Sequence, residues 1–159
     1  MNPKVESLKK RTKADMILSF IFSVFALYKS CECLIFYFSK GMKESDLLLN
    51  GIYGIAIFVS YLIIVLILLE VYKKGSPFTK MVIRSLRFLS IWVVITSVLP
   101  KPLTNIIHEV RSGSITVLTL EEFCTGVNLV ILVLGVVIGI ISEIFVYGYE
   151  LQQDNDLIA

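Results

Sequence analysis

Two long stretches without a charged residue constrain the fold of this chain more than any other feature. Leu47–Leu69 runs for 23 residues and Phe123–Ser142 for 20 residues without one Asp, Glu, Lys or Arg. A helix that crosses a bilayer needs about 20 mostly apolar residues. We therefore predict that both stretches form membrane-spanning helices.

Two weaker spans complete the pattern. The segment 14–38 is long enough to cross but carries two charges in its interior, and 88–99 is uncharged for only 12 residues. The second segment can cross if Arg84 and Arg87 reach toward the headgroups, or if its helix continues past Pro100. The whole chain is 56% hydrophobic, above the 45–50% usual for soluble domains.

These observations predict an all-α, polytopic membrane protein with one domain, residues 1–159, in which four transmembrane helices form a bundle. The predicted spans cover about 14–38, 47–71, 81–100 and 123–147. Lys and Arg number ten in the N-terminal tail and the middle loop, and four in the other two loops. The positive-inside rule then places both termini in the cytoplasm.

Helix-capping residues predict where two of these helices begin. Ser76 followed by Pro77 is typical of an N-cap and a first helical residue, so the third helix is expected to begin near Pro77. Residues 119–122 (TLEE) form a capping box, which predicts that the fourth helix begins near Leu120. Pro100 is expected to end or kink the third helix.

A short amphipathic helix is expected in the loop between the third and fourth spans. Its apolar residues recur at helical spacing, and Gly113 is expected to stop it; they are Leu103, Ile106, Ile107 and Val110. Such a helix is predicted to lie on the outer membrane surface.

The residues needed for catalysis are missing from the sequence. The single histidine, His108, lies in the outer loop, and the motifs of zinc proteases, serine hydrolases and P-loops do not occur. Cys31 and Cys33 lack metal-site spacing and partners. We predict that the protein is not an enzyme and has no cofactor, no metal site and, with a net charge of +2, no direct contact with nucleic acid.

Charged residues at membrane depth are the first candidate site. They are costly unless paired, and they mark either a structural lock or a functional path. Lys29 and Glu32 share a helical face, but Lys before Glu is the less favourable order, so each is expected to have another partner. Glu143, near the inner end of the fourth helix, is expected to pair with Lys29 or Arg87. The alternatives are an interhelical polar lock, an ion or proton relay, and a polar hinge between two states.

The predicted cytoplasmic face carries the second candidate site. A basic face on the third helix contains Lys80, Arg84 and Arg87, and an acidic C-terminal tail contains Glu150, Asp154 and Asp156. The basic face can act as a collar on anionic headgroups, and the tail can dock on that face or bind a soluble partner. Gly135 and Gly139 form a G-x-x-x-G that favours packing within the bundle over a homo-oligomer.

Two stretches resemble a bacterial family called domain of unknown function 2975. They are residues 75–79 (GSPFT), followed by two arginines at the mouth of a span, and residues 149–158 (YELQQDNDLI) after an apolar helix. The resemblance implies a small inner-membrane protein with four spans, often encoded beside a small helix-turn-helix transcription regulator.

Three functions are compatible with the sequence. The leading hypothesis is a non-enzymatic membrane protein that regulates or anchors a cytoplasmic helix-turn-helix regulator. The second is a small oligomeric transporter or channel subunit that uses Glu143 and Lys29. The third is a toxin-immunity protein that acts through the outer loop, residues 101–122.

Overall fold

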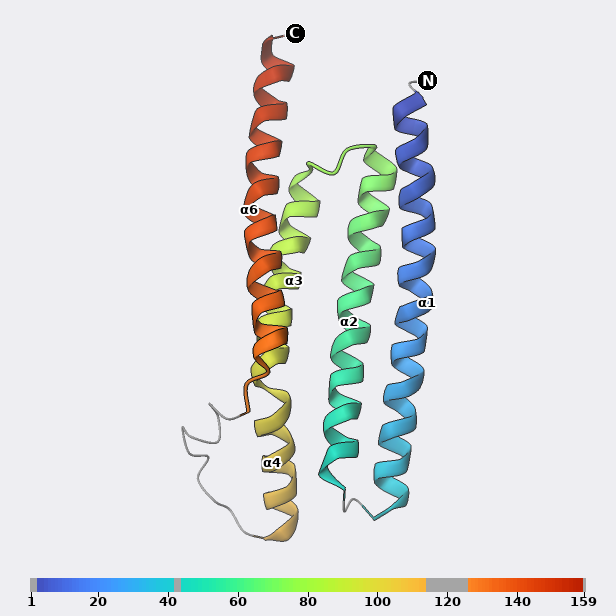
Figure 1. Ribbon diagram of the computed structural model, residues 1–159, viewed down its shortest axis with the longest axis vertical. Helices are drawn as coiled ribbons and strands as arrows, with labels where there is room; N and C mark the ends of the chain where they lie inside the picture. Colours follow the sequence, from blue (N-terminus) through green and yellow to red (C-terminus); the bar gives the residue numbers. More distant parts are fainter. Residues whose placement is uncertain (1–2, 42–43, 114–125, 159) are drawn as a thin grey trace.

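A computed structural model describes residues 3–41, 44–113 and 126–158 of the chain, and this part is almost entirely helical (Figure 1). Its five helices are α1 (Pro3–Ser39), α2 (Ser45–Lys74), α3 (Lys80–Val98), α4 (Pro100–Ser112) and α6 (Leu129–Ile158).

Four of these helices are long and apolar enough to cross a membrane. The qualifying segments are Lys9–Ser39, Ser45–Lys74, Lys80–Val98 and Leu129–Asn155. Long apolar helices of this kind satisfy their own backbone hydrogen bonds, as the bilayer interior requires. The prediction of an all-α protein with four such helices is confirmed, and the helices indicate a multi-pass membrane protein.

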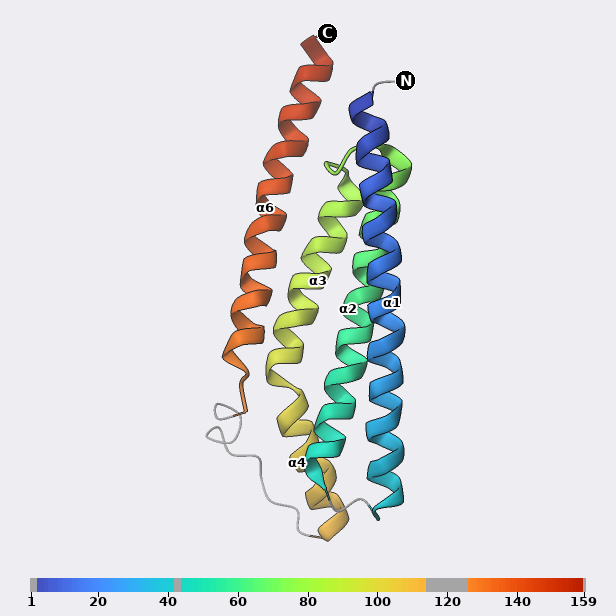
Figure 2. The same ribbon diagram turned by 45° about the vertical axis from the view of Figure 1, so that its right-hand side comes forward.

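The long helices are antiparallel and pack as two hairpins. The most extensive contacts join α1 to α2 and α3 to α6, and a smaller interface joins α2 to α3. Figures 1 and 2 show the helices following one another in the order α1, α2, α3, α6. Both termini lie at one end of the molecule, beside the turn from α2 to α3 (Figure 1). We call this end the termini-bearing end.

Small residues set the spacing within the first hairpin. The Ser30 hydroxyl on α1 donates a 2.7 Å hydrogen bond to the carbonyl oxygen of Gly51 on α2. A Cβ atom at Gly54 would lie 2.7 Å from the Ser30 Cβ, so only glycine permits this approach. Close backbone approach at small residues is the usual means by which helices associate in membranes, where the hydrophobic effect does not drive them together.

A compact core joins the two hairpins. Ile63 on α2 packs with Leu89 and Val93 on α3, and each of the three is at most 8% exposed. The Trp92 indole on α3 donates a 3.2 Å hydrogen bond to the carbonyl oxygen of Ala56 on α2. The α2–α3 interface is therefore fixed by both packing and a directed polar contact.

The start of α3 differs from the prediction. The helix begins at Lys80, and its N-cap is Thr79, whose hydroxyl accepts a 3.2 Å hydrogen bond from the Val82 amide. The Ser76 hydroxyl instead accepts a hydrogen bond from the Phe78 amide, 3.3 Å away, in the preceding turn. The prediction of a helix beginning at Pro77 was wrong because Ser76 closes a local turn and does not cap a helix.

Pro100 ends α3 and begins α4, as its missing amide hydrogen allows. Leu99 is the C-cap residue of α3, and Pro100 is the first residue of α4. Gly113, with φ of 75°, ends α4, which confirms the predicted stop. In Figure 1, α4 continues the line of α3 alongside α2. The Arg111 guanidinium donates a 2.9 Å hydrogen bond to the Gly41 carbonyl and joins α4 to the turn after α1.

The start of α6 is later than predicted. The helix begins at Leu129, and the side-chain oxygen of Asn128 accepts a 3.2 Å hydrogen bond from the Ile131 amide. Asn is among the best N-cap residues, and the preceding Gly126 is a poor helix former. The Asn128 amide also bonds the Ser97 carbonyl at 2.8 Å, which fixes this end of α6 to α3. The capping box at 119–122 lies outside the described residues.

Candidate functional site: the α3–α6 pair and the termini-bearing end

Two glycines and a serine bring α3 and α6 into close contact. A Cβ atom at Gly135 would lie 2.8 Å from a methyl carbon of Val94, and one at Gly139 would lie 2.9 Å from the Ser90 hydroxyl oxygen. That hydroxyl donates a 2.8 Å hydrogen bond to the Gly135 carbonyl. The G-x-x-x-G motif of α6 therefore packs against α3 of the same chain.

An interhelical ion pair lies one turn beyond this contact, toward the termini-bearing end. One guanidinium nitrogen of Arg87 lies 3.0 Å and 3.2 Å from the two carboxylate oxygens of Glu143. The two side chains are 53% and 59% exposed, so the pair faces the surroundings of the protein and not a closed core. A cavity of about 420 Å³ adjoins it, lined in part by Ser90 and Gly139.

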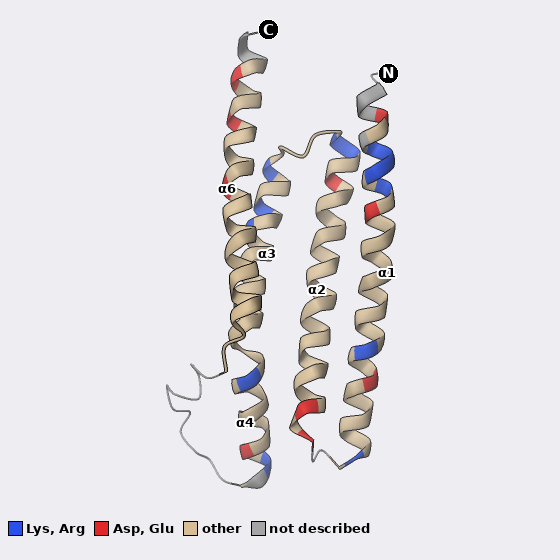
Figure 3. Cartoon of the chain, in the orientation of Figure 1, with Lys and Arg blue, Asp and Glu red and all other residues tan. Residues whose placement is uncertain are grey.

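The other charged residues at membrane depth form a separate pair. The Lys29 ammonium lies 2.8 Å from the Glu32 carboxylate, so the expectation that each has a different partner was wrong. Because the adjacent Ser30 bonds Gly51, this pair is level with the first turns of α2, toward the end opposite the termini. Figure 3 shows charged residues gathered toward both ends of the bundle. Glu143 therefore pairs with Arg87 and not with Lys29.

The turn between α2 and α3 docks on the terminal part of α6. The rings of Phe78 and Phe145 lie 5.3 Å apart between centroids. A Cβ atom at Gly148 would overlap the Phe78 ring, so this glycine leaves the space that the ring fills. The Ser76 hydroxyl donates a 3.1 Å hydrogen bond to the side-chain oxygen of Gln152. We call residues 75–80 the docking turn.

The predicted basic face is divided among different contacts. Lys80 places its ammonium 5.7 Å from the centroid of the Tyr149 ring, a cation–π distance. Arg87 pairs with Glu143. Arg84 is exposed and has no ion pair with a described residue. The three residues therefore do not form one uniform anion-binding patch.

The predicted acidic tail continues α6 as a helix to Ile158. Glu150 and Asp154 are exposed, and neither forms an ion pair with the side chains that the structure describes. Asp156 lies within the helix, but its side chain is outside the described residues. The tail docks through Phe145, Tyr149 and Gln152, while its described acids face solvent.

Several residues that build this end were missed by sequence reasoning. The Phe78 ring fills the space left by Gly148, and the Ser90 hydroxyl on α3 donates a hydrogen bond to the Gly135 carbonyl on α6. Glycine in an apolar helix indicates a close neighbour, but the spacing does not name that neighbour.

Cys31 and Cys33 are free cysteines. Among the described residues, no group of three or more His, Cys, Asp or Glu could hold a metal ion.

One protein family matches nearly the whole chain. The family model described as Protein of unknown function (DUF2975) matches residues 1–158, which include both hairpins, the docking turn and all of α6. The chain belongs to this family. Among curated proteins and among solved structures, none matches the chain. The family confirms the resemblance found in residues 75–79 and 149–158, and its description assigns no activity.

If the Arg87–Glu143 pair is a structural lock, Glu143→Gln should lower the free energy of unfolding by about 1 kcal/mol, the scale of polar contacts between membrane helices. The measurement is unfolding of the purified protein in detergent, followed by circular dichroism. Glu150→Gln, which neutralises an exposed acid without a described ion pair, is the control and should change little. Unchanged stability of Glu143→Gln would contradict the lock and favour the relay.

Proposed function

We propose that this chain is a non-enzymatic regulatory membrane protein whose termini-bearing end binds a soluble partner in the cytoplasm. We further propose that the partner is a helix-turn-helix transcription regulator. The observation that carries the proposal is that α6 runs as one helix from its apolar part through Ile158 and presents exposed acids beside the docking turn.

Charge complementarity supports a DNA-binding partner. Residues 150–154 are all exposed, and they carry two acids and no base. DNA-binding domains present a basic surface to the phosphate backbone. An acidic helix can occupy such a surface and compete with DNA, which would couple membrane anchoring to release of the regulator.

The orientation required by this proposal follows from the distribution of Lys and Arg. Ten lie within residues 4–13 and 73–87, toward the termini-bearing end, against four within residues 40–43 and 101–111. By the positive-inside rule, this distribution supports an orientation with this end on the cytoplasmic side of a bacterial inner membrane.

The geometry of α6 supports a route from membrane to partner. Its apolar part packs mainly on α3, and its exposed end contacts the docking turn at the start of α3. A continuous helix transmits a shift or rotation along its axis with little loss. A membrane signal that changes the α3–α6 contact would therefore move the acidic end.

Truncation after Tyr149 is expected to abolish binding of the partner. The test co-expresses the tagged chain with a candidate helix-turn-helix regulator and measures the regulator recovered from solubilised membranes. Charge reversal at Glu150 and Asp154 should lower recovery at least about tenfold, because two attractive charges become repulsive.

Glu44→Lys provides a control at the opposite end, where it breaks an exposed ion pair with Lys40. It should leave recovery unchanged. Full recovery with the truncated chain would overturn the role of the tail.

The transport hypothesis has less support. Lys29 and Glu143 lie in separate ion pairs on different hairpins, and each pair is closed by its own partner. A path that uses both would need polar groups between them. The immunity hypothesis depends on an outer loop of which residues 114–125 are outside the described part of the chain.

A further inference from the structure

A cavity of about 450 Å³ lies between α1 and α2, and its lining changes character from one end to the other. Lys29 and Asn50 contribute polar groups, while Phe22, Phe25 and Tyr61 contribute aromatic rings. The Phe22 and Tyr61 rings stack with centroids 5.8 Å apart. The volume lies within the range of small-molecule sites, roughly 300–1,000 Å³.

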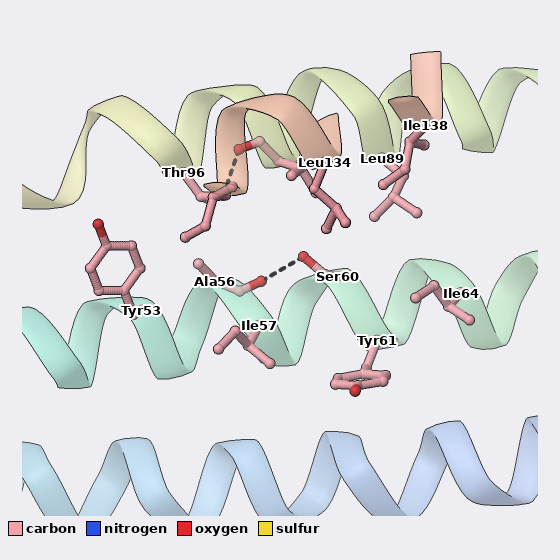
Figure 4. A pocket seen from close by; sticks show the side chains of 12 residues that line it. Tyr53, Ala56, Ile57, Ser60, Tyr61, Ile64, Leu89, Thr96, Leu134 and Ile138 are labelled. Atoms are coloured by element: carbon pink, nitrogen blue, oxygen red, sulfur yellow. Dashed lines mark hydrogen bonds between the residues drawn. The ribbon is translucent and has the colours of Figure 1, made fainter. Parts of the chain in front are cut away.

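The polar and aromatic ends are ordered along the membrane normal. Because α1 and α2 are antiparallel, the step from Lys29 back to Phe22 on α1 runs in the same direction as the step from Asn50 to Tyr61 on α2. Both steps lead toward the termini-bearing end. The polar end of the cavity therefore lies nearer the opposite membrane surface, and the aromatic end lies deeper in the bilayer. Figure 4 draws a different pocket, lined by α2, α3 and α6, and in that view the Tyr61 ring projects from α2 on the side of α1.

Lys29 lies within reach of the headgroups of the membrane surface opposite the termini, because a lysine side chain can extend toward that surface. Residues 16–28 of α1 are uncharged, a stretch of 13 residues or about 20 Å of helix. The hydrocarbon core is about 30 Å thick. With Asp15 at one edge of that core, Lys29 lies about 9 Å inside the other edge, and Glu32 lies about one turn nearer to it. A charged pair at that depth requires polar partners.

We propose that this cavity binds one glycerophospholipid of the leaflet opposite the termini. One acyl chain lies beside Phe22, Phe25 and Tyr61, and the headgroup lies at the Lys29–Glu32 pair. The amphipathic order of the cavity is that of a lipid in this leaflet, with its polar group toward the surface and its chain toward the bilayer centre.

Charge complementarity selects the headgroup class. Lys29 is already neutralised by Glu32 at 2.8 Å, so a purely anionic headgroup would meet the Glu32 carboxylate as a like charge. A phosphoethanolamine headgroup carries both signs. Its phosphate oxygens accept from the Lys29 ammonium, and its primary ammonium donates to Glu32. The site is therefore assigned to phosphatidylethanolamine-type lipids.

The test measures lipid retained by the purified full-length chain. The protein is incubated with equimolar phosphatidylethanolamine and phosphatidylglycerol with identical acyl chains, and native mass spectrometry counts the bound lipids. We expect one retained lipid per chain, with the ethanolamine lipid favoured about tenfold. Lys29→Ala should abolish this preference. Ala26→Trp, which fills the cavity without changing its charges, should abolish retention.

The chain contains a matched control for the charge substitution. Lys40 and Glu44 form an ion pair with the same 2.8 Å separation, and Lys40 is as exposed as Lys29, but neither residue lines this cavity. Lys40→Ala should leave both retention and preference unchanged. Equal effects of Lys29→Ala and Lys40→Ala, or a preference for phosphatidylglycerol, would overturn the assignment.

A second measurement uses the unmodified chain and does not depend on the folding of a variant. A phosphatidylethanolamine with a photoreactive group in its acyl chain should label the part of α1 near Phe22 and the part of α2 near Tyr61. It should label these parts in preference to the exposed apolar face of α6. Uniform labelling would show that lipid contacts the protein without preference for this cavity, and it would defeat the proposal. Chain-to-chain cross-links at this cavity, with no lipid label, would show that a second copy occupies it and would also defeat it.

Discussion

Replacing Gly135 with leucine is expected to lower the free energy of unfolding by about 3 kcal/mol, at the upper end of the overpacking range. Even a Cβ atom there would lie 2.8 Å from Val94 and 3.0 Å from its backbone nitrogen. Backbone cannot move aside as a flexible side chain can, so α6 must separate from α3. Separation also breaks the Ser90–Gly135 hydrogen bond. Equilibrium unfolding in detergent micelles, followed by circular dichroism, measures the loss.

Val133→Leu is the matched control, because it adds bulk to the same helix at a side chain that is 60% exposed. Its stability should be within about 0.5 kcal/mol of the unmodified chain. Similar losses in both variants would mean that bulk anywhere on α6 is harmful, and the close α3–α6 contact would lose its special role.

Replacing Gly148 with leucine is expected to detach the docking turn. The new side chain would occupy the place of the Phe78 ring, and loss of that ring's burial should cost about 2 kcal/mol locally. Lys73 and Lys74 precede the docking turn and Lys80 is its last residue, and all three are trypsin sites. When opening is fast, cleavage follows the open population, so its rate should rise about 30-fold.

The control for this experiment is Ile144→Phe, which adds a ring to a 59% exposed position on the same helix. Trypsin should cut this variant in the turn at the rate of the unmodified chain. The proposed function adds a further expectation, because detaching the turn should also reduce recovery of the soluble partner. Unchanged cleavage of Gly148→Leu would show that Phe78 does not hold the turn on α6.

The sequence predicted the spans well where length alone decides. The uncharged stretch Leu47–Leu69 lies wholly within α2 and is long enough for a span by itself. The stretch Phe123–Ser142 overlaps α6 only from Leu129 onward, and α6 reaches the length of a span by continuing past Glu143. Helix starts depended on more. Ser76 and Thr79 are both capable N-caps, and the choice of Thr79 accompanies the docking of Phe78 on a helix far away in the chain. The local sequence around Ser76 and Thr79 therefore cannot predict which of the two caps the helix.

Charge pairing was predicted less well for a related reason. The sequence shows that Glu143 needs a cation, but the choice between Arg87 and Lys29 depends on which helices adjoin and at which level. Helix α6 packs on α3, and Lys29 lies toward the other end of the bundle beside Gly51. The spacing of Gly135 and Gly139 correctly favoured internal packing, yet only the structure identifies Ser90 and Val94 as their neighbours.

The division into two hairpins has a consequence for biogenesis. The main contacts of α1 are with α2, and those of α6 are with α3, so each half of the chain contains its own helix partner. During synthesis, the first pair can associate once α2 has been inserted, before the second pair exists, because folding units form from the N-terminus onward. No early helix has to wait for a partner encoded at the other end of the gene. The α2–α3 interface then closes as a later step, between two preassembled halves.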